Sequence, residues 1–137
     1  MKRHIKWPVL AALILALVTA ANVRAGEIVV IVNLAAAPLS KEQIADLYLG
    51  RSDARTPIDQ TVGSEIYAEF YKKLTGRDSA QIKAIWSRIL FTGRGVPPKQ
   101  LADSAAVKKA VAANPKAVGY IEKSAVDASV KIALVLD

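Results

Sequence analysis

The apolar residues of the chain follow two periods, one typical of buried strands and one typical of helices that bury a single face. Residues 27–33 read Glu-Ile-Val-Val-Ile-Val-Asn, a continuous run of β-branched residues. Strands buried on both faces have this pattern, so the run indicates a parallel sheet covered by helices. Residues 118–121 and 130–136 are predicted to be the closing strands, and residues 57–59 could form a short one.

Four other segments carry apolar residues at intervals of three and four, as amphipathic helices do. Each begins at a residue type that caps helices; these residues are Ser40, Ser64, Asp78 and Ser104. In the first and third segments a glutamine follows three residues later, which is the spacing of a capping box. Glycine at 50 and 76 ends the first two segments, and Asn114-Pro115 ends the fourth. Residues 91–98, with two glycines and two prolines, predict a loop.

Strands and helices therefore alternate along the chain, which predicts an α/β fold. We expect a single three-layer lobe, in which a small, mostly parallel sheet is flanked by helices. Residues 26–137 show no repeat, no low-complexity tract and no internal linker, so they are expected to form one domain.

The first 25 residues have the order of a secretory signal peptide. A basic start at residues 1–6 is followed by an apolar run at 9–21, and Val23-Arg24-Ala25 places small residues where a signal peptidase cuts. The uncharged run is shorter than the roughly 20 residues that span a bilayer. We therefore expect cleavage after Ala25, a periplasmic domain of residues 26–137, and no stable membrane anchor.

Removal of this segment changes the charge and the chemistry of the chain. The full chain carries 19 basic and 12 acidic side chains, but four basic ones lie within residues 1–25. Residues 26–137 thus have a net charge of +3, since 15 basic side chains face 12 acidic ones, and a nucleic-acid partner is not expected. The chain has no cysteine, and its one histidine is His4. We expect no enzyme activity, no catalytic residue, no metal and no cofactor.

Three segments together resemble the phosphate-binding proteins of ABC transporters. Residues 39–50, Leu-Ser-Lys-Glu-Gln-Ile-Ala-Asp-Leu-Tyr-Leu-Gly, are similar to one motif of that family, and residues 114–121, Asn-Pro-Lys-Ala-Val-Gly-Tyr-Ile, are similar to another. Between them, residues 63–70 stand where the family opens a helix with Ser-Gly-Thr. The resemblance covers residues 28–136.

The resemblance implies the fold of only one lobe of a type II periplasmic binding protein. Family members have two lobes and clamp the oxyanion between them, whereas the first lobe has no counterpart here. The chain thus resembles a short, single-lobe member of this superfamily, for which the Phe91-Thr-Gly-Arg-Gly segment looks characteristic.

The resemblance places an oxyanion site at Gly63 and Ser64. A helix N-terminus presents unpaired N–H groups and partial positive charge, so it can bind phosphate. This sequence departs from the family pattern, because Val62 replaces the family serine and the family arginine falls at Ile58 or Asp59. A carboxylate there would repel an anion. The alternative is that Ser64 is an ordinary N-cap.

Other residues could supply the missing positive charge. Arg55, Arg94 or Arg51 are candidates, and Thr92-Gly93-Arg94 could form an anion-binding nest of backbone amides with an arginine beside it. The alternative for this segment is a flexible turn. The candidate ligand residues are therefore Gly63, Ser64, Arg55, Thr92, Gly93 and Arg94.

Two functions of different classes remain open. The chain could bind phosphate or another small anion as a solute-binding protein with a weak or degenerate site. Alternatively, it could have kept the lobe fold without binding phosphate and act as an interaction or adaptor protein of the cell envelope, with a protein partner there.

Overall fold

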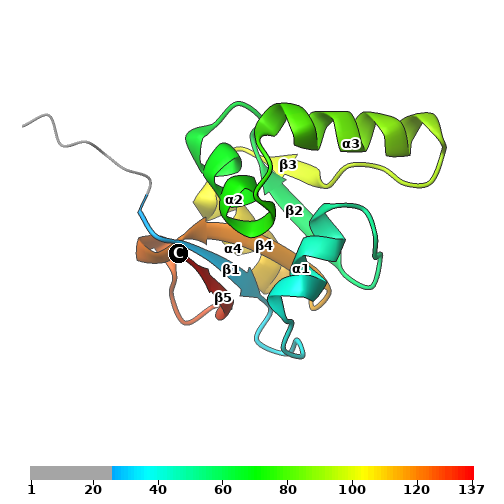
Figure 1. Ribbon diagram of the computed structural model, residues 1–137. Helices are drawn as coiled ribbons and strands as arrows, with labels where there is room; N and C mark the ends of the chain where they lie inside the picture. The colour runs from blue at the N-terminus through cyan, green and yellow to red at the C-terminus, as the bar shows by residue number, and fades with distance from the viewer. Residues whose placement is uncertain (1–25) are drawn as a thin grey trace, which may run out of the picture.

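The computed structural model describes residues 26–137, so the predicted signal peptide lies outside the described residues. Five strands, four α-helices and one short 3-10 helix follow in chain order (Figure 1). They are β1 (Ile28–Val32), α1 (Lys41–Tyr48), β2 (Thr56–Gln60), α2 (Glu65–Thr75), α3 (Ser79–Phe91), β3 (Lys99–Leu101), α4 (Ser104–Ala113), β4 (Ala117–Glu122), η1 (Lys123–Ala125) and β5 (Lys131–Leu136).

The strands form one sheet in the order β3-β2-β4-β1-β5. Strand β2 runs parallel to β3 and β4, while β1 runs antiparallel to both of its neighbours, β4 and β5. Four of the five strands therefore point the same way, which confirms the mostly parallel sheet. The prediction that β1 itself pairs in parallel was wrong. Its apolar run reflects burial on both faces, since all five of its residues are buried, and burial does not determine strand direction.

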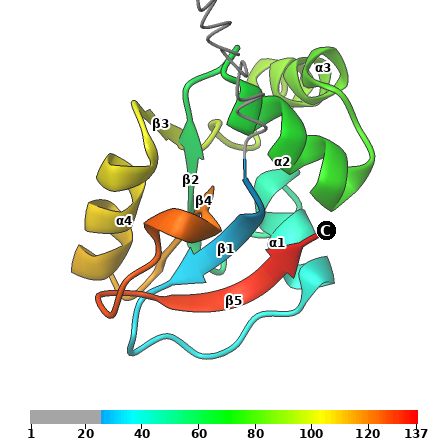
Figure 2. The same ribbon diagram turned by 90° about the vertical axis from the view of Figure 1, so that its left-hand side faces the viewer.

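Helices cover both faces of the sheet, so the predicted three layers are confirmed (Figure 2). Helices α1 and α2 bury their apolar faces against one side of the sheet, α3 packs on α2 and on the end of α1 in the same core, and α4 buries Val107 and Val111 against the other side. Alternate residues of β1 enter the two cores: Val30 faces the three-helix side and Ile31 faces α4.

The helix ends follow the sequence signals with one exception. Both predicted capping boxes form, at Ser40 with Gln43 and at Asp78 with Gln81. Helix α4 was expected to be capped by Ser104, but Asp103 is its N-cap and accepts a hydrogen bond from the amide of Ala106 at 2.8 Å. The Ser104 hydroxyl instead accepts a hydrogen bond from the Gln60 side chain at 3.0 Å.

Residues of segments 39–50 and 114–121, which resemble two motifs of the family, connect helices to the sheet and to each other. The Tyr48 hydroxyl donates to the carbonyl oxygens of Ile58 and Val118, at 2.9 and 3.1 Å, and so ties α1 to β2 and β4. Gly50 ends the first segment with φ of +72°, and a side chain there would run into Ile89 of α3. Tyr48 and Gly50 therefore stabilise the packing of the fold. This explains why a resemblance at these positions predicts the fold.

Candidate functional site

The candidate residues lie at opposite ends of strand β2. Arg55 directly precedes the strand, whereas Gly63 and Ser64 follow it and begin α2. Five residues of strand span about 16 Å, so Arg55 does not supply the charge missing beside Gly63 and Ser64. The six candidates therefore do not form one site.

Ser64 caps its own helix. Its hydroxyl accepts a hydrogen bond from the Tyr67 amide at 3.3 Å, and its amide donates to the Thr61 carbonyl at 3.0 Å. Gly63 has φ of +89°, with open space where a side chain would stand. The N-cap alternative thus describes the geometry of Ser64, and anion binding at this end of β2 stays a prediction.

A buried carboxyl group lies beneath this end of β2. Asp59 is only 4% exposed and accepts hydrogen bonds from the hydroxyl groups of Tyr71 and Tyr120, each at 2.8 Å. Burial raises the pKa of Asp59 to about 7, although both hydrogen bonds act to lower it. A neighbouring hollow of about 260 Å³ is lined by Asp59 and Lys83 and otherwise by uncharged residues. This environment gives an anion little electrostatic support.

The backbone amides of the turn after α3 are used within the turn itself. The amides of Thr92 and Gly93 donate to the carbonyls of Arg88 and Leu90, each at 3.1 Å, and the amide of Arg94 donates to that of Ile89 at 3.2 Å. All three amides therefore cap the end of the helix. These bonds fit the alternative of an ordinary turn, because the helix C-terminus itself needs such donors, and anion binding at this turn stays a prediction.

The side chains of three arginines, however, meet across a cleft. Arg51 follows α1, Arg55 precedes β2 and Arg94 follows α3, and together they line a cleft of about 520 Å³. Asp53 also lines it. An adjoining hollow of about 620 Å³ is lined by Arg51, Arg94 and a further arginine, Arg88.

The acidic groups near this cleft do not neutralise it. Arg51 has Asp46 at 3.8 Å, but both side chains are largely exposed, so the pair is weak. Four arginines thus line the cleft and its adjoining hollow, where Asp53 is the one acidic lining residue, and Asp46 lies outside both spaces beside Arg51.

Arg55 brings a hydrogen-bond donor that the protein does not satisfy. Its Nη2 donates to the Ala37 carbonyl at 3.2 Å, whereas its Nη1 is buried without a hydrogen-bond partner. Leaving a buried charged donor unpaired costs free energy, so an anion that reached this Nη1 would satisfy a group without a partner among residues 26–137.

Sequence reasoning included Arg51, Arg55 and Arg94 but did not bring them together, and it missed Arg88. These four residues are spread over 44 positions and share no motif, so no local signal could have grouped them. Among residues 26–137, no group of three acidic, histidine or cysteine side chains could hold a metal ion. Within the same range, no helix is both long and apolar enough to cross a bilayer.

Comparison with known proteins finds likeness in structure alone. No family model matches the sequence, and no curated protein matches it. An ABC-type phosphate transport receptor from Vibrio cholerae is 20% identical over 77% of this chain, with a TM-score of 0.58. A structure described as a phosphate ABC transporter substrate-binding protein with bound phosphate, from Clostridium perfringens, is 22% identical over 77%, with a TM-score of 0.59.

The chain spans less than half of either structure, 44% of the first and 43% of the second. At such identities the likeness is one of fold. It confirms the resemblance that the sequence motifs suggested, as far as the architecture is concerned. Residues 26–137 thus have an α/β fold that matches a single lobe of a phosphate-binding protein of ABC transporters.

Proposed function

We propose that residues 26–137 bind a small oxyanion such as phosphate in the cleft between Arg51, Arg55 and Arg94. The observation that carries this proposal is the cleft that Arg51, Arg55 and Arg94 line together. Arg55 adds a buried Nη1 that has no hydrogen-bond partner among the described residues. Guanidinium groups present paired donors that match the oxygens of phosphate. The fold it shares with proteins described as phosphate receptors supports the choice of anion.

The open form of the cleft sets the expected affinity. A single lobe leaves the bound anion facing water, where salt screens each contact. We therefore expect weak, reversible binding, with a Kd between roughly 10 µM and 1 mM at low salt. In this proposal the protein is a non-enzymatic solute-binding module of the periplasm, to which the signal peptide directs it.

Substituting Arg55 tests the proposal. Arg55→Gln removes the orphaned charged donor, and hydrogen bonds to charged groups are strong enough for phosphate affinity to fall tenfold or more. Isothermal titration of residues 26–137 with phosphate at low salt measures this change. Arg77→Gln is the matched control, because Arg77 lies between α2 and α3 and lines neither the cleft nor the adjoining hollow.

Fluorescence supplies a second readout. Trp86 lines the cleft and donates its indole N–H to the Tyr48 carbonyl at 3.1 Å. Of the chain's two tryptophans, Trp7 lies outside residues 26–137, so emission from this segment comes from Trp86. Trp86 also lines the hollow beside Asp59, so the Arg55→Gln variant is needed to assign a change in emission to the cleft. Equal phosphate affinity in folded Arg55→Gln and in the unmodified segment would exclude the cleft as the site.

A different variant distinguishes the cleft from the alternative anion site at Gly63 and Ser64. Ser64→Ala removes the capping hydroxyl and is expected to cost about 1 kcal/mol of stability, but it leaves the arginine cleft intact. If Ser64→Ala abolishes phosphate binding while Arg55→Gln does not, the anion binds at the start of α2.

A second function, that of an envelope interaction protein, is favoured by the free edge of the sheet. Among the described strands β5 pairs only with β1, and its residues Ile132 and Val135 are 41% and 38% exposed. An open edge strand can accept a strand from another protein. If this is the function, cross-linking in envelope extracts should recover one reproducible partner, and Ile132→Asp should lose it. A variant with unchanged cross-linking would rule out this edge.

A further inference from the structure

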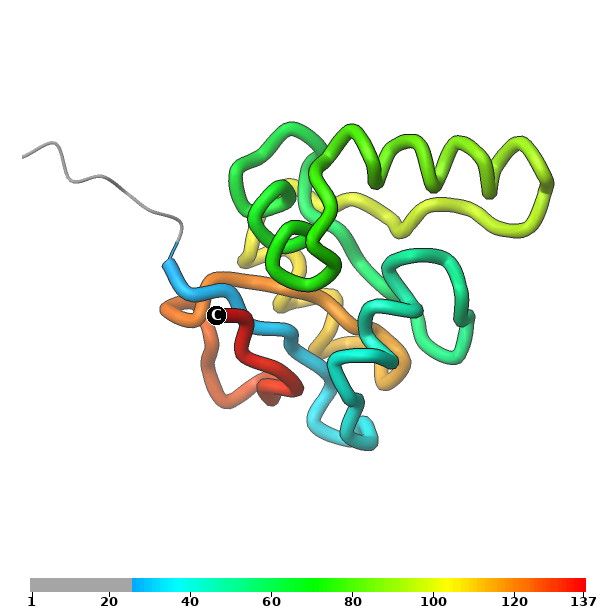
Figure 3. The backbone as a smooth tube through the Cα atoms, in the orientation of Figure 1, coloured from blue at the N-terminus to red at the C-terminus, as the bar shows by residue number. Residues whose placement is uncertain are grey.

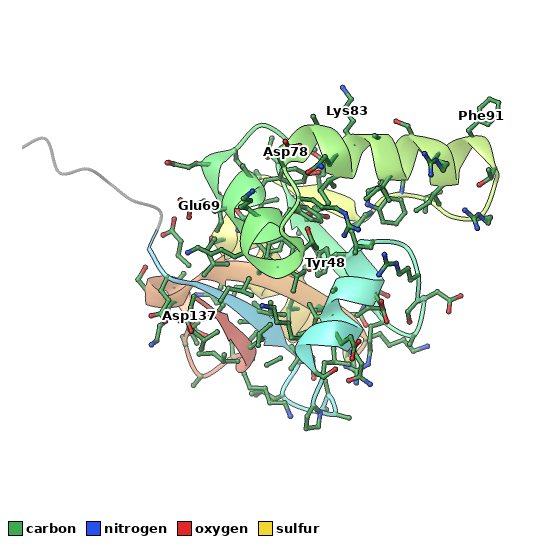
Figure 4. All side chains as sticks on the ribbon, in the orientation of Figure 1. Tyr48, Glu69, Asp78, Lys83, Phe91 and Asp137 are labelled. Carbon is green, nitrogen blue, oxygen red and sulfur yellow. The ribbon has the colours of Figure 1, made fainter. Side chains whose placement is uncertain are left out.

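Helix α3 carries apolar side chains into solvent at its C-terminal end. Its last turn and the loop behind it extend beyond the rest of the body (Figures 1 and 3). Phe91 is 94% exposed there, and Figure 4 shows its ring pointing away from the protein. Leu90 and Val96, 49% and 76% exposed, lie on the same helix end and loop. We name these three residues the α3 tip.

The segment that bears the α3 tip carries positive charge only. Residues 79–102 contain no aspartate or glutamate and have four cations, Lys83, Arg88, Arg94 and Lys99. Arg88 lies one turn before Phe91 and Arg94 lies three residues after it, and both are exposed. Both also line the hollow of about 620 Å³. The apolar tip is thus flanked by guanidinium groups.

We propose that the α3 tip binds the surface of an anionic phospholipid bilayer. Phe91 and its apolar neighbours enter the boundary between headgroups and acyl chains, where aromatic rings are favoured. Arg88 and Arg94 then meet the phosphate groups of the lipid, with the attraction that anionic surfaces exert on basic side chains. Val96 and Arg94 also line the cleft at Arg55, whereas Phe91 and Leu90 do not. The inference therefore rests on Phe91, and it stands whether or not the cleft binds an anion.

The shape of the tip favours a bilayer over a protein. A stable protein interface buries roughly 800 Å² on each partner and needs a matching surface, whereas the tip offers three side chains on a protruding end. A bilayer adapts to such a projection without a preformed groove. One apolar wedge and two cations give reversible association, well short of a permanent anchor.

The experiment measures co-sedimentation with vesicles at low salt. It uses residues 26–137, which hold both hydrophobic cores, because the apolar run at 9–21 would itself enter a bilayer. Vesicles of phosphatidylglycerol are compared with vesicles of phosphatidylcholine. We expect binding to the anionic vesicles only, a loss of roughly tenfold in partitioning for Phe91→Ser, and a loss of roughly fivefold for Arg88→Gln.

Leu34→Ser is the matched control. Leu34 is 57% exposed, but it lies in the loop between β1 and α1, away from α3. Its substitution should leave vesicle binding unchanged. Phe91→Ser should also keep its heat of phosphate binding, while Arg55→Gln should lose phosphate binding and keep vesicle binding. Each of the two proposals can therefore be refuted without refuting the other.

Two outcomes would overturn the proposal. One is the absence of binding to phosphatidylglycerol vesicles by folded residues 26–137. The other is equal binding by Phe91→Ser and the unmodified segment. Capture of a protein by the tip without any vesicle binding belongs to the first outcome and would assign the surface to a protein partner.

Discussion

The free energy of unfolding of residues 26–137 is expected to fall by about 4 kcal/mol as the pH rises from 4 to 8, because of one buried carboxyl group. Burial raises the pKa of Asp59 from 3.8 to about 7 in the folded protein. In the unfolded chain the group returns to its ordinary value. Between these two pKa values the folded state binds a proton that the unfolded state has lost, so stability decreases as pH rises through this window and then levels off.

No histidine interferes with this measurement, because the one histidine of the chain is His4. Asp127 acts in the opposite direction and at lower pH. Hydrogen bonds from Lys108 and Ser129 hold the pKa of Asp127 well below its usual range, so its contribution is lost only as the pH falls below about 4. Stability should therefore be greatest near pH 4, close to the ordinary pKa of 3.8 that both carboxyl groups have in the unfolded chain.

Asp59→Asn isolates the effect of this carboxyl group. The amide has the shape of the protonated acid and can still accept a hydrogen bond from Tyr120, but it does not titrate. Urea unfolding between pH 4 and 8 should then give a nearly flat stability profile, and the variant should exceed the unmodified segment at pH 8. Tyr71→Phe should extend the pH-dependent range upward, since its hydroxyl lowers the pKa of Asp59. A slope unchanged in Asp59→Asn would contradict this account.

Gly119→Ala is expected to destabilise the fold by about 3 kcal/mol, at the upper end of the usual range for overpacking. A Cβ atom at Gly119 in β4 would collide with Val107 of α4 and would stand 3.1 Å from the Cγ2 of Val111. This Cβ is fixed to the strand backbone, so α4 itself must shift. Chemical denaturation at constant pH measures the change.

A double variant tests the cause of this loss. Val107→Ala removes the methyl groups that the new Cβ meets, so Gly119→Ala with Val107→Ala should be at least 1 kcal/mol more stable than the sum of the single losses predicts. Gly26→Ala is the control, because no atom lies within 4 Å of a Cβ built there. Additive losses would mean that the glycine matters for some reason other than the approach of α4.

The same glycine shows why the sequence predicts the fold well. Gly119 belongs to segment 114–121, and Tyr48 and Gly50 belong to segment 39–50. Gly119 and Tyr48 allow or fix contacts between layers, and Gly50 allows the close approach of α3 to the end of α1. Local signals also placed the helices, since capping side chains and terminal glycines act within a few residues. The direction of β1 could not be predicted from the sequence, because its burial on both faces is compatible with parallel and with antiparallel pairing. The three-residue strand β3 was missed because Lys99–Leu101 are too few to show a period.

The candidate site was less predictable because it depends on tertiary contacts. The motif led to Gly63 and Ser64, where the structure shows a helix cap above a buried acid. The arginine cleft forms only because the ends of α1 and α3 approach the start of β2, and no spacing in the sequence encodes that approach. From the sequence, Asp59 is expected to be a carboxylate that repels an anion. In the folded protein its side chain accepts hydrogen bonds from two tyrosine hydroxyl groups.

The most direct test of the proposed anion site is a nuclear magnetic resonance titration of residues 26–137 with phosphate, using sulfate as the competing anion. The account predicts that the largest shifts fall on the side-chain Nε–H groups of Arg51, Arg55 and Arg94 and on the neighbouring backbone amides. Shifts confined to Gly63, Ser64 and Glu65 would move the site to the start of α2. The absence of a shift with either anion would contradict the solute-binding proposal, and only the fold would then remain established.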